Sequence, residues 1–116
     1  MPNTLSKKQR LKSELKISEL FSQGKTLIAY PLRICYLSNN GDENCMMVSV
    51  PKKLFKRAVK RNLLKRRIRE AYRLNQTYLD TNNRHIDIAF SYIDPEILSF
   101  YQIQKAVIKA LQKIKI

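Results

Sequence analysis

The sequence is poor in acidic residues, glycine and histidine, and it contains no tryptophan. Its 116 residues include 9 Asp or Glu, 2 Gly and one His against 23 Lys or Arg, so the formal net charge is +14 at pH 7. A small domain with so much unbalanced positive charge repels itself, and nucleic acid is the anionic partner that best accounts for it. No window approaches 18 consecutive apolar residues, which argues against a membrane partner.

Residues that bind metals or form disulfides are equally scarce. Cys35 and Cys45 are the two cysteines and His85 is the one histidine, too few and too widely spaced for a structural zinc site. The first ten residues contain no apolar run that could act as a signal peptide. We therefore expect a cytoplasmic protein with two free thiols.

The length and the 44% hydrophobic content fit one domain with a modest core. We expect a flexible basic N-terminal segment over residues 1–12 and a single domain over residues 13–116. The domain is predicted to begin with a helix over 14–23, which Ser13 caps and which Gly24 ends in the left-handed conformation. An antiparallel hairpin of 26–37 with 45–50 and a long helix over 53–74 follow. The last predicted elements are a strand over 86–92 and a helix that starts at Asp94, Pro95 and Glu96. This α-β-β-α-β-α order predicts an α+β fold, a single-domain sandwich with a small sheet and a long basic helix.

Alternation assigns faces to two of these elements. In the first strand, Leu32, Ile34 and Tyr36 point to one side, and Arg33, Cys35 and Leu37 point to the other, less apolar side, which could stay partly open. In the last helix, the apolar stripe that predicts the buried face consists of Ile103, Ala106, Val107, Ala110, Leu111 and Ile114.

The positive charge is concentrated in one segment. Residues 52–73 contain eleven Lys or Arg and a single acid, Glu70, so they carry ten of the fourteen net charges. On a helix, Arg57, Arg61, Lys65 and Arg69 form a row that rises about 6 Å per step, a spacing suited to a phosphate backbone. A merely solvated face would mix charges of both signs, so the segment is predicted to bind an anion.

This segment resembles the sequence signature of the bacterial ribonuclease P protein subunit. The matching residues are Lys52-Lys53, Ala58-Val59, Lys60-Arg61-Asn62, Lys65-Arg66, Arg69-Glu70 and Arg73. The resemblance extends to the basic start and to the first helix with Leu20, Phe21 and Gly24. Three positions depart from the family pattern: Leu63 replaces an arginine, Pro51 replaces a serine, and Ile17 stands where an aromatic residue is often found.

The resemblance implies a division of labour. A catalytic RNA subunit holds the Mg²⁺ ions and removes the 5′ leader of precursor tRNA, while the protein is an accessory subunit that holds no cofactor or metal of its own. We expect the RNA subunit to contact Lys52, Lys53, Arg57, Lys60, Arg61, Asn62, Lys65, Arg66, Arg69 and Arg73. The predicted partners are thus the ribonuclease P RNA and precursor tRNA, with neither membrane nor DNA among them.

The leader is expected to lie in a cleft on the less apolar sheet face. Phe21 is the candidate for base stacking, since an aromatic face accepts any base, although a core role for Phe21 is an equal alternative. Arg33 and Cys35 would line the same cleft.

Other functions fit less well. His85 has no recognisable partner, and Asp80, Asp87 and Asp94 each have an ordinary structural role, so we predict no catalytic residues and no independent nuclease. A DNA-binding zipper needs heptads after the basic region, which the polar residues 75–77 interrupt. A ribosomal or other structured-RNA-binding protein is the nearest alternative.

Overall fold

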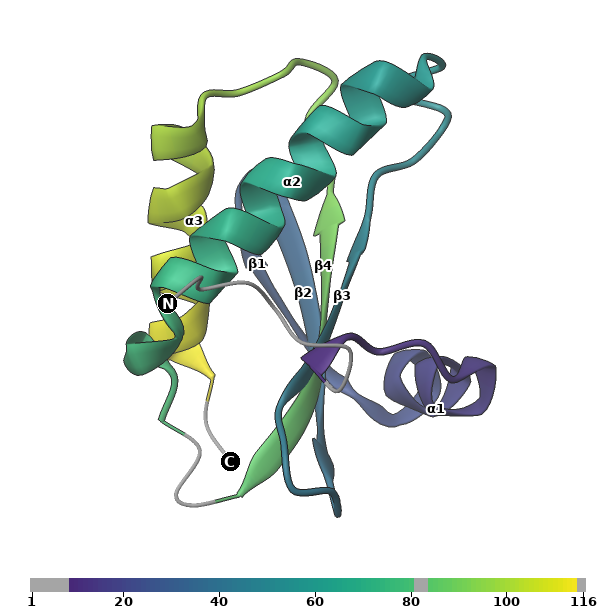
Figure 1. Cartoon of the computed structure of the whole chain (residues 1–116), viewed down its shortest axis with the longest axis vertical. Helices are drawn as coiled ribbons and strands as arrows, with labels where there is room; N and C mark the ends of the chain where they lie inside the picture. Colours follow the sequence, from purple (N-terminus) through teal and green to yellow (C-terminus); the bar gives the residue numbers. More distant parts are fainter. Residues whose placement is uncertain (1–8, 81–83, 115–116) are drawn as a thin grey trace.

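The computed structural model describes residues 9–80 and 84–114, which form a four-stranded sheet and three helices (Figure 1). In chain order the elements are α1 (Glu14–Gln23), β1 (Lys25–Ala29), β2 (Leu32–Asn39), β3 (Cys45–Ser49), α2 (Ala58–Leu74), a 3-10 helix (Gln76–Tyr78), β4 (His85–Tyr92) and α3 (Phe100–Lys113). The predicted α+β class is confirmed, and the order is α-β-β-β-α-β-α, with one strand more than predicted. No described helix is long and apolar enough to cross a membrane.

The additional strand comes from a turn inside the predicted first strand. Tyr30 and Pro31, joined by a cis peptide bond, separate β1 from β2, and these two strands form an antiparallel hairpin. The turn is held by a hydrogen bond from the Tyr30 hydroxyl to the Asp94 carboxylate, 2.6 Å, and by one from the Ile93 amide to the Pro31 carbonyl, 2.9 Å.

The predicted hairpin between residues 26–37 and 45–50 is wrong. The sheet order is β1-β2-β4-β3, so β4 lies between β2 and β3, antiparallel to β2 and parallel to β3. Local turn signals at residues 39–42 reverse the chain, but they do not decide which strand takes the neighbouring place. The connection from β3 to β4 therefore carries α2 across the sheet.

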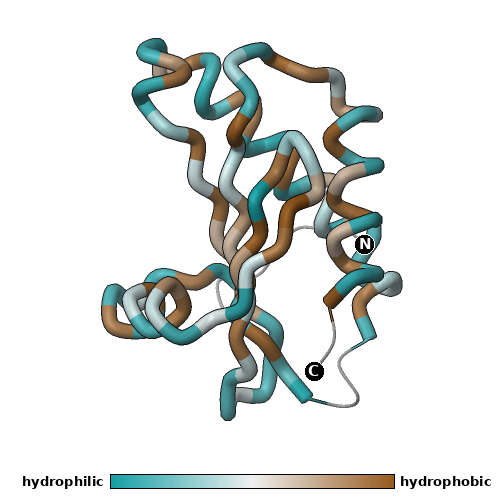
Figure 2. Tube along the Cα trace, turned by 180° about the vertical axis from the view of Figure 1, so that it is seen from behind, coloured by the Kyte–Doolittle hydropathy of each residue, from teal (hydrophilic) through white to brown (hydrophobic). Residues whose placement is uncertain are grey.

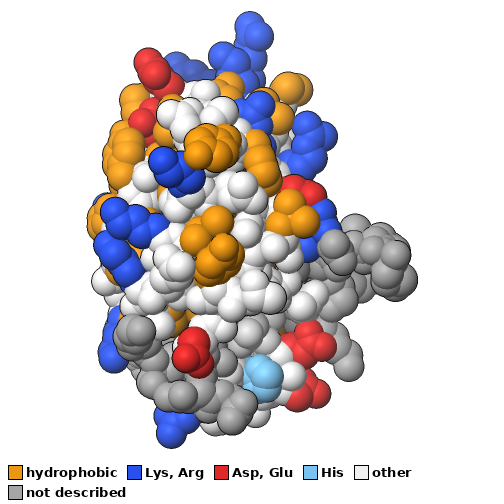
Figure 3. Space-filling view, turned by 90° about the vertical axis from the view of Figure 1, so that its left-hand side faces the viewer, with side chains coloured by type: hydrophobic (Ala, Val, Ile, Leu, Met, Phe, Trp, Pro, Cys, Tyr) orange, Lys and Arg blue, Asp and Glu red, His pale blue; other side chains and the backbone are white. Residues whose placement is uncertain are grey.

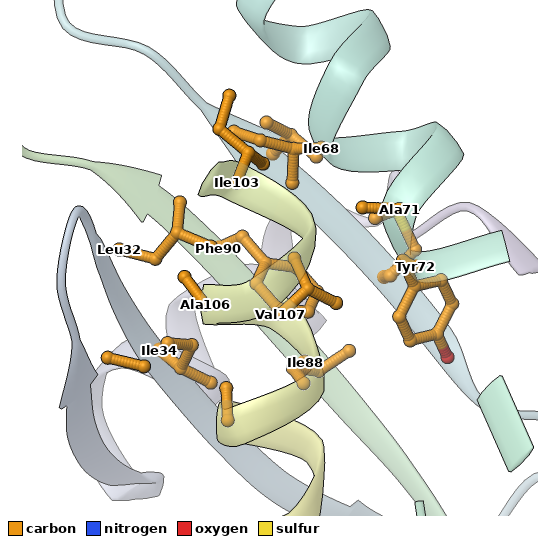
Figure 4. Close-up of a cluster of buried hydrophobic side chains, with 14 of the residues drawn as sticks. Leu32, Ile34, Ile68, Ala71, Tyr72, Ile88, Phe90, Ile103, Ala106 and Val107 are labelled. Atoms are coloured by element: carbon orange, nitrogen blue, oxygen red, sulfur yellow. The ribbon is translucent and has the colours of Figure 1, made fainter. Parts of the chain in front are cut away.

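The sheet separates two apolar clusters. On one face α2 and α3 cover Leu32, Ile34 and Tyr36 of β2, together with the alternate side chains of β4 (Figure 4). On the other face α1 covers a smaller cluster that contains Leu20, Cys35 and Ala89. The predicted alternation along β2 is confirmed, and hydrophobic positions recur along the central strands (Figure 2).

α3 begins later than predicted. Ser99 caps it through a reciprocal capping box with Gln102, and Phe100 is its first residue. The Asp94 carboxylate instead accepts hydrogen bonds from the Tyr30 hydroxyl and the Glu96 amide. The predicted helix start at Asp94 is therefore wrong: the carboxylate makes a cap-like bond to the Glu96 amide two residues on, but the helix does not begin until Phe100. The predicted apolar stripe of α3 is confirmed, and all six of its residues are buried.

The part of the N-terminal segment that the structure describes lies against the domain. The Leu11 amide donates to the Met46 carbonyl at 2.9 Å, and the Leu11 side chain is buried in the smaller cluster. Residues 1–8 of the predicted flexible segment lie outside the described residues.

Gly24 ends α1, but not in the left-handed conformation that the sequence predicts. Its φ is −73°, which any residue can adopt. What requires glycine is space: a Cβ atom there would lie 2.4 Å from the Leu20 carbonyl oxygen, 2.8 Å from the Cys35 sulfur and 2.9 Å from the Tyr36 carbonyl oxygen. The glycine thus lets the end of α1 approach β2 closely.

We expect Gly24→Ala to lower the free energy of unfolding by about 1–3 kcal/mol, because two of the three obstructing atoms belong to the backbone. Urea denaturation measures this. Gly41→Ala is the matched control, since a Cβ there meets the Asn39 side chain at 3.2 Å, and we expect it to cost less. Equal losses for the two variants would contradict the close-approach explanation.

Candidate nucleic-acid interface

The basic segment consists of a loop followed by a helix. The amides of Leu54 and Phe55 both donate to the Pro51 carbonyl at 3.2 Å, which forms a turn, and the Phe55 side chain is buried beside the Tyr92 ring. The helix predicted over 53–74 therefore begins only at Ala58. Lys52 and Lys53 lie exposed in the turn, outside the helix.

Arg61 joins this loop to the helix. Its guanidinium donates to the carbonyls of Phe55 and Lys56, both at 2.8 Å. Arg61 lies in the predicted phosphate-binding row, but its side chain is half-buried and engaged with the protein's own backbone. Its role in the fold is to hold the loop against the first turns of α2.

The predicted RNA-binding residues from Arg57, which precedes α2, to Arg73 differ in how exposed their side chains are. Arg57, Lys60, Asn62 and Arg66 are exposed, whereas Lys65, Arg69 and Arg73 are half-buried. Arg73 forms an ion pair with Glu70, the one acid of the segment. Arg67, which was not predicted as a site residue, donates to the Leu98 carbonyl at 2.6 Å and connects α2 to the residues before α3. Most of the charge on the outer surface of α2 thus has no acid to balance it.

Arg69 lies close to a second arginine from the N-terminal segment. Burial, and then the positive charge of Arg10, lower the pKa of Arg69 below its ordinary value. Arg10 is exposed and forms a β-bridge with Met46 at the β3 edge of the sheet. This bridge places Arg10 at β3, near enough to α2 for its charge to act on Arg69, which spacing along the sequence could not reveal.

A second candidate surface lies on the α1 side of the sheet. Strand register places Ile28, Arg33, Ser91 and Ser49 in one row across all four strands. Ile28 is 51% exposed and Arg33 is exposed, so this row is only partly covered. Phe21 is 52% exposed, whereas its neighbour Leu20 is fully buried and anchors α1. The core alternative for Phe21 is therefore wrong.

Cys35 does not reach this surface. It lies one register row further along, it is buried, and its thiol donates to the Leu20 carbonyl at 3.2 Å. The sequence places Cys35 on the correct face of β2, but α1 covers it. Of the three predicted leader-binding residues, the structure leaves Phe21 and Arg33 accessible.

Two of the acidic side chains make hydrogen bonds within the fold. Asp87 is buried and accepts a hydrogen bond from the Asn39 amide at 2.9 Å, while Asp94 holds the Tyr30 turn. Among the residues that the structure describes, no three His, Cys, Asp or Glu side chains lie together as metal ligands would. The described part of the chain offers positive charge and exposed aromatic surface.

Comparison with known proteins agrees with these features. The family model for ribonuclease P matches residues 5–115. The ribonuclease P protein component of Porphyromonas gingivalis is 41% identical over 117 residues, covering 95% of this chain and 85% of that protein, and the component from Petrotoga mobilis is 32% identical, covering 97% and 96%. The fold is similar to that of the RNase P protein from Thermotoga maritima, with a TM-score of 0.78, 24% identity, and coverage of 90% of this chain and 96% of that one.

We expect Arg61→Ala to lower the free energy of unfolding by about 1–3 kcal/mol, because two charge-assisted hydrogen bonds to the loop are lost. Arg66→Ala removes the same type of side chain from an exposed position of the same helix and should change stability by less than about 0.5 kcal/mol. Thermal unfolding of both variants is the measurement. Similar melting temperatures for the two variants would show that the Arg61 bonds do not stabilise the loop.

Proposed function

This chain belongs to the ribonuclease P protein family and acts as a subunit in tRNA 5′ processing, and we propose that it does so by binding the catalytic RNA and the precursor's 5′ leader on separate surfaces. The observation that carries the proposal is the basic segment 52–73, with ten of the fourteen net positive charges on one loop and helix. A ribosomal protein or another structured-RNA binder is not favoured, because the family match spans nearly the whole chain.

The RNA subunit is proposed to lie along α2 and the loop before it. Arg57, Lys60, Asn62 and Arg66 are free to contact it, and Lys65 and Arg69 have half-exposed side chains that can reach phosphates. Neutralising phosphates releases counterions, so binding at this surface should weaken steeply as salt rises. Arg10 beside Arg69 extends the same positive surface.

Cleavage itself is proposed to reside in the RNA subunit with its Mg²⁺. What supports this assignment is the family match, together with the hydrogen bonds within the fold that already engage the carboxylates of Asp87 and Asp94. The protein then contributes by offsetting the phosphate repulsion where the leader meets the RNA subunit.

The leader is proposed to contact the half-covered sheet face through Phe21 and Arg33. An exposed aromatic ring at the end of α1 accepts bases of any identity, which suits a leader whose sequence varies between precursors. Arg33 can bind a phosphate or stack on a base. This face lies on the opposite side of the sheet from α2 and α3.

Reconstitution tests the proposed division of labour. Purified protein, a bacterial ribonuclease P RNA and precursor tRNA are combined at low Mg²⁺, with the protein or the RNA omitted in turn. We expect cleavage at the mature 5′ end only when both are present. Cleavage by the protein without RNA would overturn the assignment of the chemistry to the RNA subunit.

Phe21→Ala should weaken the affinity of the holoenzyme for precursor tRNA about tenfold, because a stacking face worth roughly 1–3 kcal/mol per base is lost. Affinity for mature tRNA, which has no leader, should not change. Titration with both RNAs measures the difference.

Leu20→Ala is the matched control in the same turn of α1. Since Leu20 is fully buried, its truncation should cost about 2–5 kcal/mol of stability, and any loss of binding should affect both RNAs alike. If Phe21→Ala also lowered the melting temperature sharply and weakened both RNAs equally, Phe21 would not be a leader contact.

A further inference from the structure

The outward face of α3 carries an aromatic and basic row that neither the fold nor the proposed function explains. Tyr101 is 65% exposed, and Lys105 and Lys109 follow it at intervals of four residues, both exposed. The Lys105 ammonium lies 5.6 Å from the centroid of the Tyr101 ring, so the first two members of the row are in contact range. Successive members rise by about 6 Å along the helix.

Packing does not account for this row, and local helix chemistry accounts only for the contact between Lys105 and Tyr101. The buried stripe of α3 runs along the opposite side, and the helix start is already stabilised by Ser99 and Gln102. α3 contains no acid, so neither Lys105 nor Lys109 has an ion-pair partner one turn away, and the two lysines repel each other. Lys113 does have a structural explanation, because it lies in the last turn, where the helix dipole favours a cation.

On the side of the molecule where α3 lies, positive and apolar side chains are interspersed. On the face that α3 presents, Lys and Arg side chains alternate with exposed hydrophobic groups, and the visible acidic side chains lie near the upper and lower ends and at the right-hand edge (Figure 3). A cationic helix face with an exposed aromatic ring has the composition of a surface for single-stranded or looped RNA, in which phosphates meet lysines and an unpaired base stacks on the ring.

We propose that Tyr101, Lys105 and Lys109 form a second contact surface for the ribonuclease P RNA, with an unpaired base on Tyr101 and the following phosphates on the two lysines. The inference rests on the proposed function, since it assigns a further part of the same RNA to this chain. It adds a contact on α3 to those on α2.

The position of α3 favours the RNA subunit over precursor tRNA as the partner. α3 packs beside α2 on the same face of the sheet, whereas the proposed leader surface lies on the other face. A groove of about 360 Å³ runs between the two helices, lined by Leu63, Arg66, Arg67, Glu70 and Phe100. Its acid, Glu70, is paired with Arg73, so it presents no unbalanced negative charge to an RNA that crosses from α2 to α3.

The test measures the affinity of full-length protein for ribonuclease P RNA as a function of salt. For Lys105→Gln/Lys109→Gln we expect about tenfold weaker binding and a slope of log K against log salt that is smaller by about 1.5, as two lost phosphate contacts require. Lys16→Gln removes one such charge from an exposed position on α1, which lies on the other face of the sheet, and should leave affinity and slope nearly unchanged. Tyr101→Ala should weaken binding about tenfold, while Tyr101→Phe, which keeps the ring, should bind like the original protein.

Measuring Lys65→Ala alongside distinguishes failure of the α3 surface from failure of the proposed role of α2. If Lys65→Ala weakens binding and the α3 variants do not, the α3 surface is refuted while the proposed role of α2 stands. If no variant weakens binding, the proposed function of the basic helix fails as well. If the α3 variants bind ribonuclease P RNA normally but weaken holoenzyme affinity for mature tRNA, the partner is the tRNA body, and the proposed assignment to the RNA subunit is overturned.

Discussion

The position of β4 at the centre of the sheet is the constraint on which the rest of the structure depends. β4 pairs with β2 on one side and with β3 on the other, and it is buried on both faces. Because β3 and β4 run parallel, the chain between them must cross the sheet, and the segment that crosses is the basic helix α2. The buried side of α2 consists of Leu64, Ile68, Ala71 and Tyr72, so its cations are carried on the remaining surface.

The cations of that segment divide into two groups. Arg61, Arg67 and Arg73 bond to the Phe55 and Lys56 carbonyls, the Leu98 carbonyl and Glu70 respectively, and so they shape the protein. The exposed group, with Lys60 and Arg66 among its members, is available to an RNA. A charge count for the segment describes its attraction to polyanions, but it overstates the number of side chains that can bind one.

The two-sided sheet gives the protein two surfaces of different character. On the α2 and α3 side a large apolar core supports helices that face outward with positive charge. On the α1 side a small cluster supports only part of the sheet, so Arg33 and Ile28 stay accessible beside it. The proposed separation of RNA-subunit and leader contacts follows from this asymmetry, because α1 is a single short helix that cannot cover four strands.

The sequence by itself determined the features that depend on local pattern. These are the α+β class, helix α1 with its Ser13 cap, the inward side of β2 and α3, and the concentration of cations in residues 52–73. Each depends on hydrophobic periodicity, capping or charge, which are properties of residues close together in the sequence. Tertiary structure decided what depends on contacts between distant residues. It placed β4 between β2 and β3, paired the Asp94 carboxylate with the distant Tyr30 hydroxyl, and required glycine at position 24 for a close approach to β2. It also buried Cys35 beneath α1 while leaving Phe21 exposed, because which side chains of a helix meet a sheet is set by how the helix docks.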